Sequence, residues 1–188
     1  MAGTFLLTFD CEGKWGVVDR LAPRYQCYTT PELEAAYGGV LALLRKYGIG
    51  ATFAFTGAFS MGAAEFGRMR GQVDGSIAGA TPWIRRALES VQRDRGDGWF
   101  APSCFQAVKE GGMHEIASHG FSHMPWGAPW ATREVLDAEL ALNRQVPGFG
   151  ADAVETFIYP RNQVAHTDLL PAHGFHIFRA ARRSFGRP

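Results

Sequence analysis

The alternation of short apolar segments with helical segments constrains the fold of this chain more than any other feature. The apolar segments have the length and composition of strands that are buried on both faces; they are residues 4–10, 51–56, 114–118, 155–159 and 175–178. Capping residues, apolar spacing and Gly or Pro stops predict helices between them, over residues 30–48, 81–95, 103–109, 132–147 and 167–173. This order is typical of a parallel sheet or barrel built from βα units.

The number of strands bears on whether such a barrel is closed. We expect an α/β fold, a distorted (β/α) barrel, closed or incomplete, with a mostly parallel sheet, in which residues 1–188 form a single domain that is short at its C-terminal end if the barrel is incomplete. The five predicted strands are fewer than the roughly eight of a closed (β/α) barrel. Three explanations stay open: the chain is a truncated product, a partner chain completes an open barrel, or residues 57–80, which have no clear period, hide a strand.

Charge and composition argue against several functional classes. The 188 residues include 19 Lys and Arg against 18 Asp and Glu, a net charge of +1 that offers no basic surface for nucleic acid. No apolar run approaches the roughly 18 residues that cross a bilayer, and the N-terminus lacks the pattern of a signal peptide. The cysteines, Cys11, Cys27 and Cys104, have no CxxC spacing, which argues against a disulfide framework and a structural zinc site. We therefore expect a cytoplasmic protein.

Two carboxylates follow the first predicted strand. Side chains at i and i+2 of an extended chain point the same way, so Asp10 and Glu12 can converge on one site while Cys11 points elsewhere. Acidic residues at a strand end are also common as helix caps or as solvated loop residues. The pair indicates a functional site only together with other chemically capable residues.

A histidine pair follows the third predicted strand. His119 and His123 are four residues apart, and in a helical turn this spacing puts both imidazoles on one face, as for two ligands of one divalent metal. With one carboxylate they make three protein ligands and an open position, the pattern of a catalytic zinc site. Zinc is favoured by this donor set, while cobalt, nickel and manganese are compatible with it.

An arginine follows the fourth predicted strand, in the segment Tyr159-Pro-Arg-Asn-Gln. Arg161 carries a planar, permanently charged fork that suits a carboxylate. Taken alone, Arg161 would be interpreted as a surface residue in a turn.

Taken in order, these motifs resemble the polysaccharide deacetylase family with the NodB homology domain. The resemblance rests on Asp-Cys-Glu after the first strand, the strand Ala51–Phe55, His-Gly-Phe-Ser-His and Tyr-Pro-Arg-Asn-Gln, and it covers about residues 4–179. It implies a distorted barrel, usually of seven strands, and metal-dependent hydrolysis of an N-acyl group, usually N-acetyl, on an amino sugar. The roles that it implies are those of catalytic base for Asp10, metal ligands for Glu12, His119 and His123, and orientation of the base for Arg161.

The sequence departs from the family pattern in three places. Where the family usually has two adjacent aspartates, this chain has Asp10-Cys11-Glu12. The sequence therefore leaves open which of the two acids is the base and which is the metal ligand. Gly120 replaces the usual Ser or Thr after the first histidine, and Ser118 or Ser122 is the candidate to brace the loop in its place. The late histidine that serves as general acid has no clear match; His166, His173 and His176 are candidates in residue type only.

Three aromatic residues near the motifs are candidates for substrate binding: Trp15, Trp126 and Tyr159. Trp rings stack on sugar rings, although packing in the core explains Trp15 and Trp126 about equally well. The expected substrate is a small or carrier-linked amino sugar in the biosynthesis of a surface polysaccharide or glycolipid. The alternatives are a catalytically silent homologue that binds metal and sugar, and a deformylase or cyclic-amide hydrolase of the same superfamily. A homo-oligomer is left open.

Overall fold

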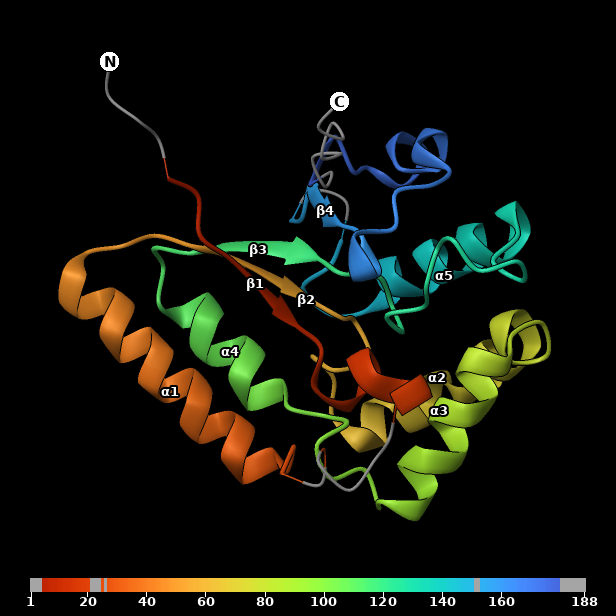
Figure 1. Cartoon of the computed structure of the whole chain (residues 1–188), viewed down its shortest axis with the longest axis horizontal. Helices are drawn as coiled ribbons and strands as arrows, with labels where there is room; N and C mark the ends of the chain where they lie inside the picture. Colours follow the sequence, from red (N-terminus) through yellow and green to blue (C-terminus); the bar gives the residue numbers. More distant parts are fainter. Residues whose placement is uncertain (1–4, 21–24, 26, 151–152, 180–188) are drawn as a thin grey trace, which may run out of the picture.

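A computed structural model describes residues 5–20, 25, 27–150 and 153–179 of the chain (Figure 1). Its strands are β1 (Thr8–Cys11), β2 (Thr52–Phe55), β3 (Glu115–Ser118), β4 (Thr156–Ile158) and β5 (Ile177–Arg179). Its α-helices are α1 (Thr30–Tyr47), α2 (Ala63–Val73), α3 (Pro82–Arg93), α4 (Pro102–Glu110) and α5 (Arg133–Gln145). Short helical segments are η1 (Gly13–Arg20), η3 (Asp74–Ala78), η4 (Pro160–Asn162), η5 (Thr167–Leu169) and η6 (Pro171–His173). All five predicted strands are therefore confirmed.

The five strands form one parallel sheet in the order β1-β2-β3-β4-β5. The sheet curls into a half-barrel, and the Arg179 guanidinium on β5 donates a hydrogen bond of 2.8 Å to Thr8 Oγ1 on β1. A side chain thus spans the gap that further strands would fill in a closed barrel. The expected α/β fold with an incomplete barrel is confirmed.

The two faces of the sheet carry different side chains because residues alternate along each strand. On β2, Phe53 and Phe55 pack into the main hydrophobic core, whereas Ala54 belongs to a small separate cluster with Ala117 and Ile158. Cys11 is 2% exposed and lies in the main core, so it points away from Asp10, as predicted.

The longest helix, α1, has strong signals at both ends. Thr29 and Glu32 form a capping box at its start, and Gly48 ends it in the left-handed conformation with φ of 63°. The helix packs beside α4 (Figure 1). These two helices cover one side of the sheet near β1 and β2.

Two segments differ from the sequence expectation. Residues 57–80 contain α2 and the π-helical segment η3 but no strand, so the idea that a strand is hidden there is wrong. Residues 13–20, expected as a loop, form the 3-10 segment η1, which packs Trp15 and Val18 into the core. Within the described residues, no helix is both long and apolar enough to cross a membrane.

Two glycines of the α1 region give a matched test of backbone effects on stability. We expect Gly48→Ala to lower the free energy of unfolding by about 1 kcal/mol, because a Cβ is strained at positive φ. Gly39→Ala, inside the helix with open space around its Cα, should raise it by up to about 1 kcal/mol. Urea unfolding measures both, and equal signs for the two changes would contradict this assignment of the helix end.

Candidate metal centre

Glu12, His119 and His123 converge at the carboxyl ends of β1 and β3. The Glu12 Oε2 atom lies 2.6 Å from His123 Nε2 and 3.2 Å from His119 Nε2. One ligand atom of each residue lies within 4.8 Å of the others. Both imidazoles are almost fully buried, while the Glu12 side chain is 28% exposed. The sequence prediction of two histidines and one carboxylate on one site agrees with this geometry.

The histidine loop, residues 119–123, is not the helical turn that the four-residue spacing suggested. It is irregular, with Gly120 at φ of 77° and His123 at φ of 56°. Backbone hydrogen bonds tie it to the end of β2, from His119 N to Phe55 O and from Gly57 N to Gly120 O, each 2.8 Å long. The two imidazole rings still lie close, 4.7 Å apart between centroids. Gly120 provides the positive φ that the bend requires.

The orientation and burial of the two histidines suit metal binding. His119 Nδ1 lies 2.7 Å from Ile158 O and donates to this carbonyl, so Nε2 is the ring nitrogen that faces Glu12. That Nε2 atom is buried and has no hydrogen-bond partner among the described residues. Burial lowers the pKa of His123 and favours its neutral form. The residues present therefore fit a divalent metal with two nitrogen ligands and one oxygen ligand.

The Glu12 carboxyl is held in its charged form. Burial alone would raise its pKa, but the close contacts of its Oε2 atom with the His119 and His123 imidazoles outweigh burial and hold the pKa below its usual range. A carboxylate that stays ionised is the form that binds a metal.

Asp10 lies beside this triad rather than in it. Its Oδ2 atom is 3.9 Å from His119 Nε2 and accepts a hydrogen bond of 2.9 Å from Arg179. The Arg179 guanidinium also donates to Asn162 Oδ1 at 3.1 Å and to Thr8. Sequence analysis missed Arg179 because it placed the end of the last strand at residue 178, one residue too early.

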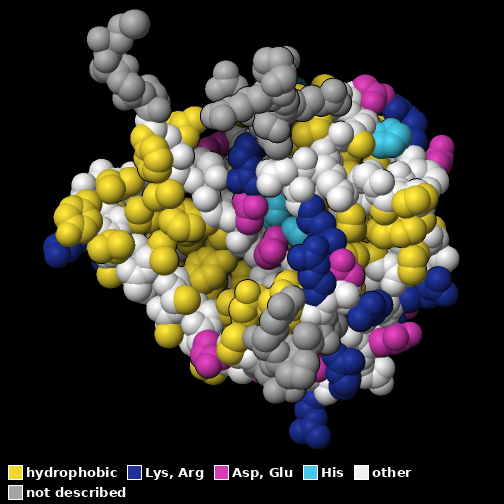
Figure 2. Space-filling view, viewed as in Figure 1, with side chains coloured by type: hydrophobic (Ala, Val, Ile, Leu, Met, Phe, Trp, Pro, Cys, Tyr) yellow, Lys and Arg dark blue, Asp and Glu magenta, His cyan; other side chains and the backbone are white. Residues whose placement is uncertain are grey.

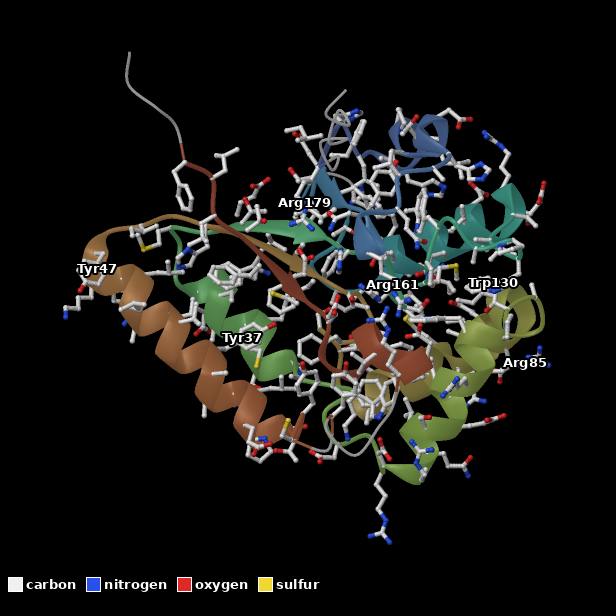
Figure 3. The ribbon with its side chains drawn as sticks, in the orientation of Figure 1. Tyr37, Tyr47, Arg85, Trp130, Arg161 and Arg179 are labelled. Atoms are coloured by element: carbon white, nitrogen blue, oxygen red, sulfur yellow. The ribbon has the colours of Figure 1, made fainter. Side chains whose placement is uncertain are left out.

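Arg161, the expected partner of Asp10, contacts a different carboxylate. Its guanidinium donates to both carboxylate oxygens of Asp19 at 2.9 and 2.5 Å, which lowers the pKa of Asp19. It also lies over the Trp83 ring, 4.9 Å from the centroid. Arg161 has φ of 56°, and its side chain is directed at η1. Figure 3 shows Arg161 next to η1 and Arg179 apart from it, toward β4. Among the described residues, the Arg161–Asp10 pairing is therefore replaced by Arg179–Asp10.

Two members of the triad, Glu12 and His123, line a cavity of about 410 Å³, a volume within the range of small-molecule sites. Its lining is Asp10, Glu12, Gly16, Val17, Arg20, His123, Arg161 and Gln163. Figure 2 shows acidic and histidine side chains in the middle of this face, with basic side chains beside them. The lining is mostly polar and contains no Phe, Tyr or Trp in the described part of the chain.

The three aromatic residues expected to bind substrate lie in the core instead. Trp15 is 1% exposed and donates its Nε1 proton to Trp99 O at 2.8 Å. Trp126 and Tyr159 are 1% and 0% exposed and pack edge to face with centroids 5.0 Å apart. Rings buried in this way have no free face for a sugar, so the substrate-binding prediction for these residues is corrected to core packing.

The two serines of the histidine region brace it, as the sequence suggested. Ser118 Oγ accepts from Gly120 N at 3.2 Å and from Asn143 Nδ2 at 2.9 Å. Ser122 donates through its backbone N and its hydroxyl to Glu139, at 2.7 and 3.0 Å. Burial raises the pKa of Glu139 to about 7, against the hydrogen bonds from Ser122. Glu139 and Asn143 were not predicted, because the helix over residues 132–147 was identified from its apolar residues alone.

The late histidines offer no general acid at this site. His173 pairs with Asp137 at 2.8 Å. Within the described residues, the lining of the metal cavity includes none of His166, His173 and His176.

The open α/β barrel brings two histidines and a carboxylate together at its strand ends, a donor set that could hold a divalent metal. The family model for polysaccharide deacetylases matches residues 3–167, and the chain belongs to this family. Among solved structures it is similar to IcaB from Ammonifex degensii, with 14% identity and a TM-score of 0.53. That match covers 92% of this chain and 57% of IcaB, so the chain spans little more than half the length of its structural relative.

A second solved structure is a CE4 family pseudoenzyme from Bacillus anthracis. It matches with 11% identity and a TM-score of 0.43, over 92% of this chain and 41% of that one. No curated protein matches the chain.

The triad predicts how metal binding responds to substitution. We expect His119→Ala and His123→Ala each to weaken Zn²⁺ binding at least 100-fold, because each removes one of three protein ligands. His173→Ala, which removes a histidine outside the cavity, should leave the affinity unchanged. Titration against a chromophoric chelator measures the affinities. Equal effects of the three substitutions would rule out this ligand set.

Proposed function

We propose that the protein is a metal-dependent hydrolase that removes an N-acyl group, most simply N-acetyl, from an amino sugar. Membership of the polysaccharide deacetylase family supports this chemistry. The observation that carries the proposal is the convergence of Glu12, His119 and His123 beside a polar cavity that Asp10, Glu12 and His123 line. When bound there, zinc would polarise the amide carbonyl and lower the pKa of a water molecule.

The two carboxylates, Glu12 and Asp10, have different roles in this proposal. Glu12 contacts both imidazoles through one oxygen, which supports a role as metal ligand. Asp10 lies outside the triad and is paired with an arginine, which supports a role as the base that accepts the proton of the attacking water. Of the two assignments left open by the sequence, these contacts favour Asp10 as base.

Arg179 takes the orienting role in this proposal. Its guanidinium is held by Thr8 and Asn162 and donates to Asp10 Oδ2, so a fixed arginine orients the Asp10 carboxylate. Arg161 instead anchors η1, which carries Gly16 and Val17 of the cavity lining, through Asp19. Its part in catalysis is then to hold the wall of the substrate cavity.

The polar cavity is compatible with an amino sugar recognised by hydrogen bonds. It stays a prediction that the substrate is a small or carrier-linked amino sugar. The role in the biosynthesis of a surface polysaccharide or glycolipid also stays a prediction. The cytoplasmic location and a homo-oligomeric state also stay predictions.

A catalytically silent homologue that binds metal and sugar is the second candidate. One observation favours it: among the described residues, the cavity lining has no histidine besides the proposed metal ligand His123 that could protonate the leaving nitrogen. Binding of N-acetylated sugars without turnover would support this candidate. A third candidate is a deformylase or cyclic-amide hydrolase of the same superfamily. Turnover of formylated or cyclic amides alone would support it.

Acetate release separates these candidates. We expect the zinc-loaded chain to release acetate from N-acetylglucosamine oligomers or from a nucleotide-linked N-acetyl amino sugar, because the site combines a metal and a base. Asp10→Asn should lower kcat by at least about 100-fold while Zn²⁺ binding is kept. Glu12→Gln should instead weaken Zn²⁺ binding, since it loses the charged ligand. If Asp10→Asn lost the metal and Glu12→Gln kept it, the two roles would be reversed.

The two arginines provide a second test. Arg179→Ala should lower kcat by about 10- to 100-fold, the size of a lost hydrogen bond to a charged group. Arg161→Ala, the matched control on the same cavity, should change KM more than kcat. Steady-state kinetics on the zinc-loaded proteins measure both. A larger fall in kcat for Arg161→Ala would restore the family role to Arg161.

A further inference from the structure

Helix α5 carries a buried polar pair that the reaction itself does not require. Glu139 and Asn143 are both 0% exposed and lie four residues apart, so they share one face of the helix. Both face the end of β3, where the histidine loop begins, through the contacts to Ser118 and Ser122.

Glu139 and Asn143 hold the histidine loop through the residues next to His119 and His123. Glu139 accepts hydrogen bonds from the backbone N and the hydroxyl of Ser122, directly before His123. Asn143 donates to Ser118 Oγ at 2.9 Å, and the same oxygen accepts from Gly120 N, so this contact brackets His119. The residues on both sides of His119 and the residue before His123 are therefore tied to one helix.

A purely structural reason for a buried carboxylate at this place is weak. Burying a carboxyl group away from water costs free energy, and within the described residues only hydrogen bonds, with no charged partner, act on Glu139 to offset that cost. An apolar residue at this position would pack α5 against the loop without this free-energy cost. What the carboxylate provides is two acceptors for an irregular loop in which Gly120 and His123 both adopt positive φ.

We propose that Glu139 is a positioning residue for the metal centre: through Ser122, and with Asn143 acting through Ser118, it fixes the spacing of the two imidazoles. This inference rests on the proposed function, because it needs His119 and His123 to be metal ligands. Groups that orient metal ligands from outside the coordination sphere typically change metal affinity 10- to 100-fold when they are replaced.

The test measures Zn²⁺ affinity of the whole chain by competition with a chromophoric chelator. We expect Glu139→Gln to bind Zn²⁺ at least about 10-fold more weakly, and Ser122→Ala, which removes one donor to Glu139, to show a smaller loss in the same direction. The visible spectrum of bound Co²⁺ should change in both variants, because it reports ligand geometry.

Two controls separate positioning from stability. Glu134→Gln makes the same chemical change on the exposed side of α5, and Leu136→Ala destabilises the same helix without a hydrogen bond to the histidine loop. Both should keep Zn²⁺ affinity within about 2-fold. If Glu139→Gln does not fold, the milder Ser122→Ala decides the result.

The outcomes distinguish the two proposals. If the unmodified chain binds no metal, the proposed function fails, and this inference fails with it. If the unmodified chain binds Zn²⁺ but the Glu139 and Ser122 variants bind it as tightly as Leu136→Ala does, only the positioning role is overturned.

Discussion

The contact of the Glu12 carboxylate with the two imidazoles is the interaction around which the site is built. It joins the end of β1 to the loop after β3, two segments more than 100 residues apart that the parallel sheet brings to one edge. Contacts with the two imidazoles hold the pKa of Glu12 below its usual range, and burial lowers the pKa of His123. This arrangement is the one that a divalent metal needs before it binds.

The open barrel gives this site its second feature. Within the described residues, no further strand closes the barrel from β5 back to β1. The Arg179 side chain crosses this gap to Thr8 and Asp10. A residue whose first effect is to link two sheet edges therefore also fixes the carboxylate that we propose as base. The stability of the open barrel and the geometry of the site are coupled through one guanidinium.

Much of the fold and the ligand set could be predicted from local patterns, and the rest depends on tertiary contacts. Apolar runs revealed all five strands, and the two-residue period aimed Asp10 and Glu12 together. The His119 and His123 spacing predicted a shared site for the wrong reason, because Gly120 bends the loop where a helix was expected. Trp126 and Tyr159 were misjudged because their position in the chain does not show which side of the loop is buried. The Arg179–Asp10 pair joins residues 169 apart, a contact that only the curl of the sheet produces.

The central claim is that Glu12, His119 and His123 hold a catalytic divalent metal with a coordination position left open for water or substrate. Anomalous diffraction at the zinc absorption edge, from crystals of the zinc-loaded chain, tests this most directly. The account predicts a single peak within bonding distance of His119 Nε2, His123 and a Glu12 oxygen, about 2.0–2.2 Å from each, with Asp10 outside the coordination sphere. A peak at other residues, or a fourth protein side chain closing the site, would contradict it.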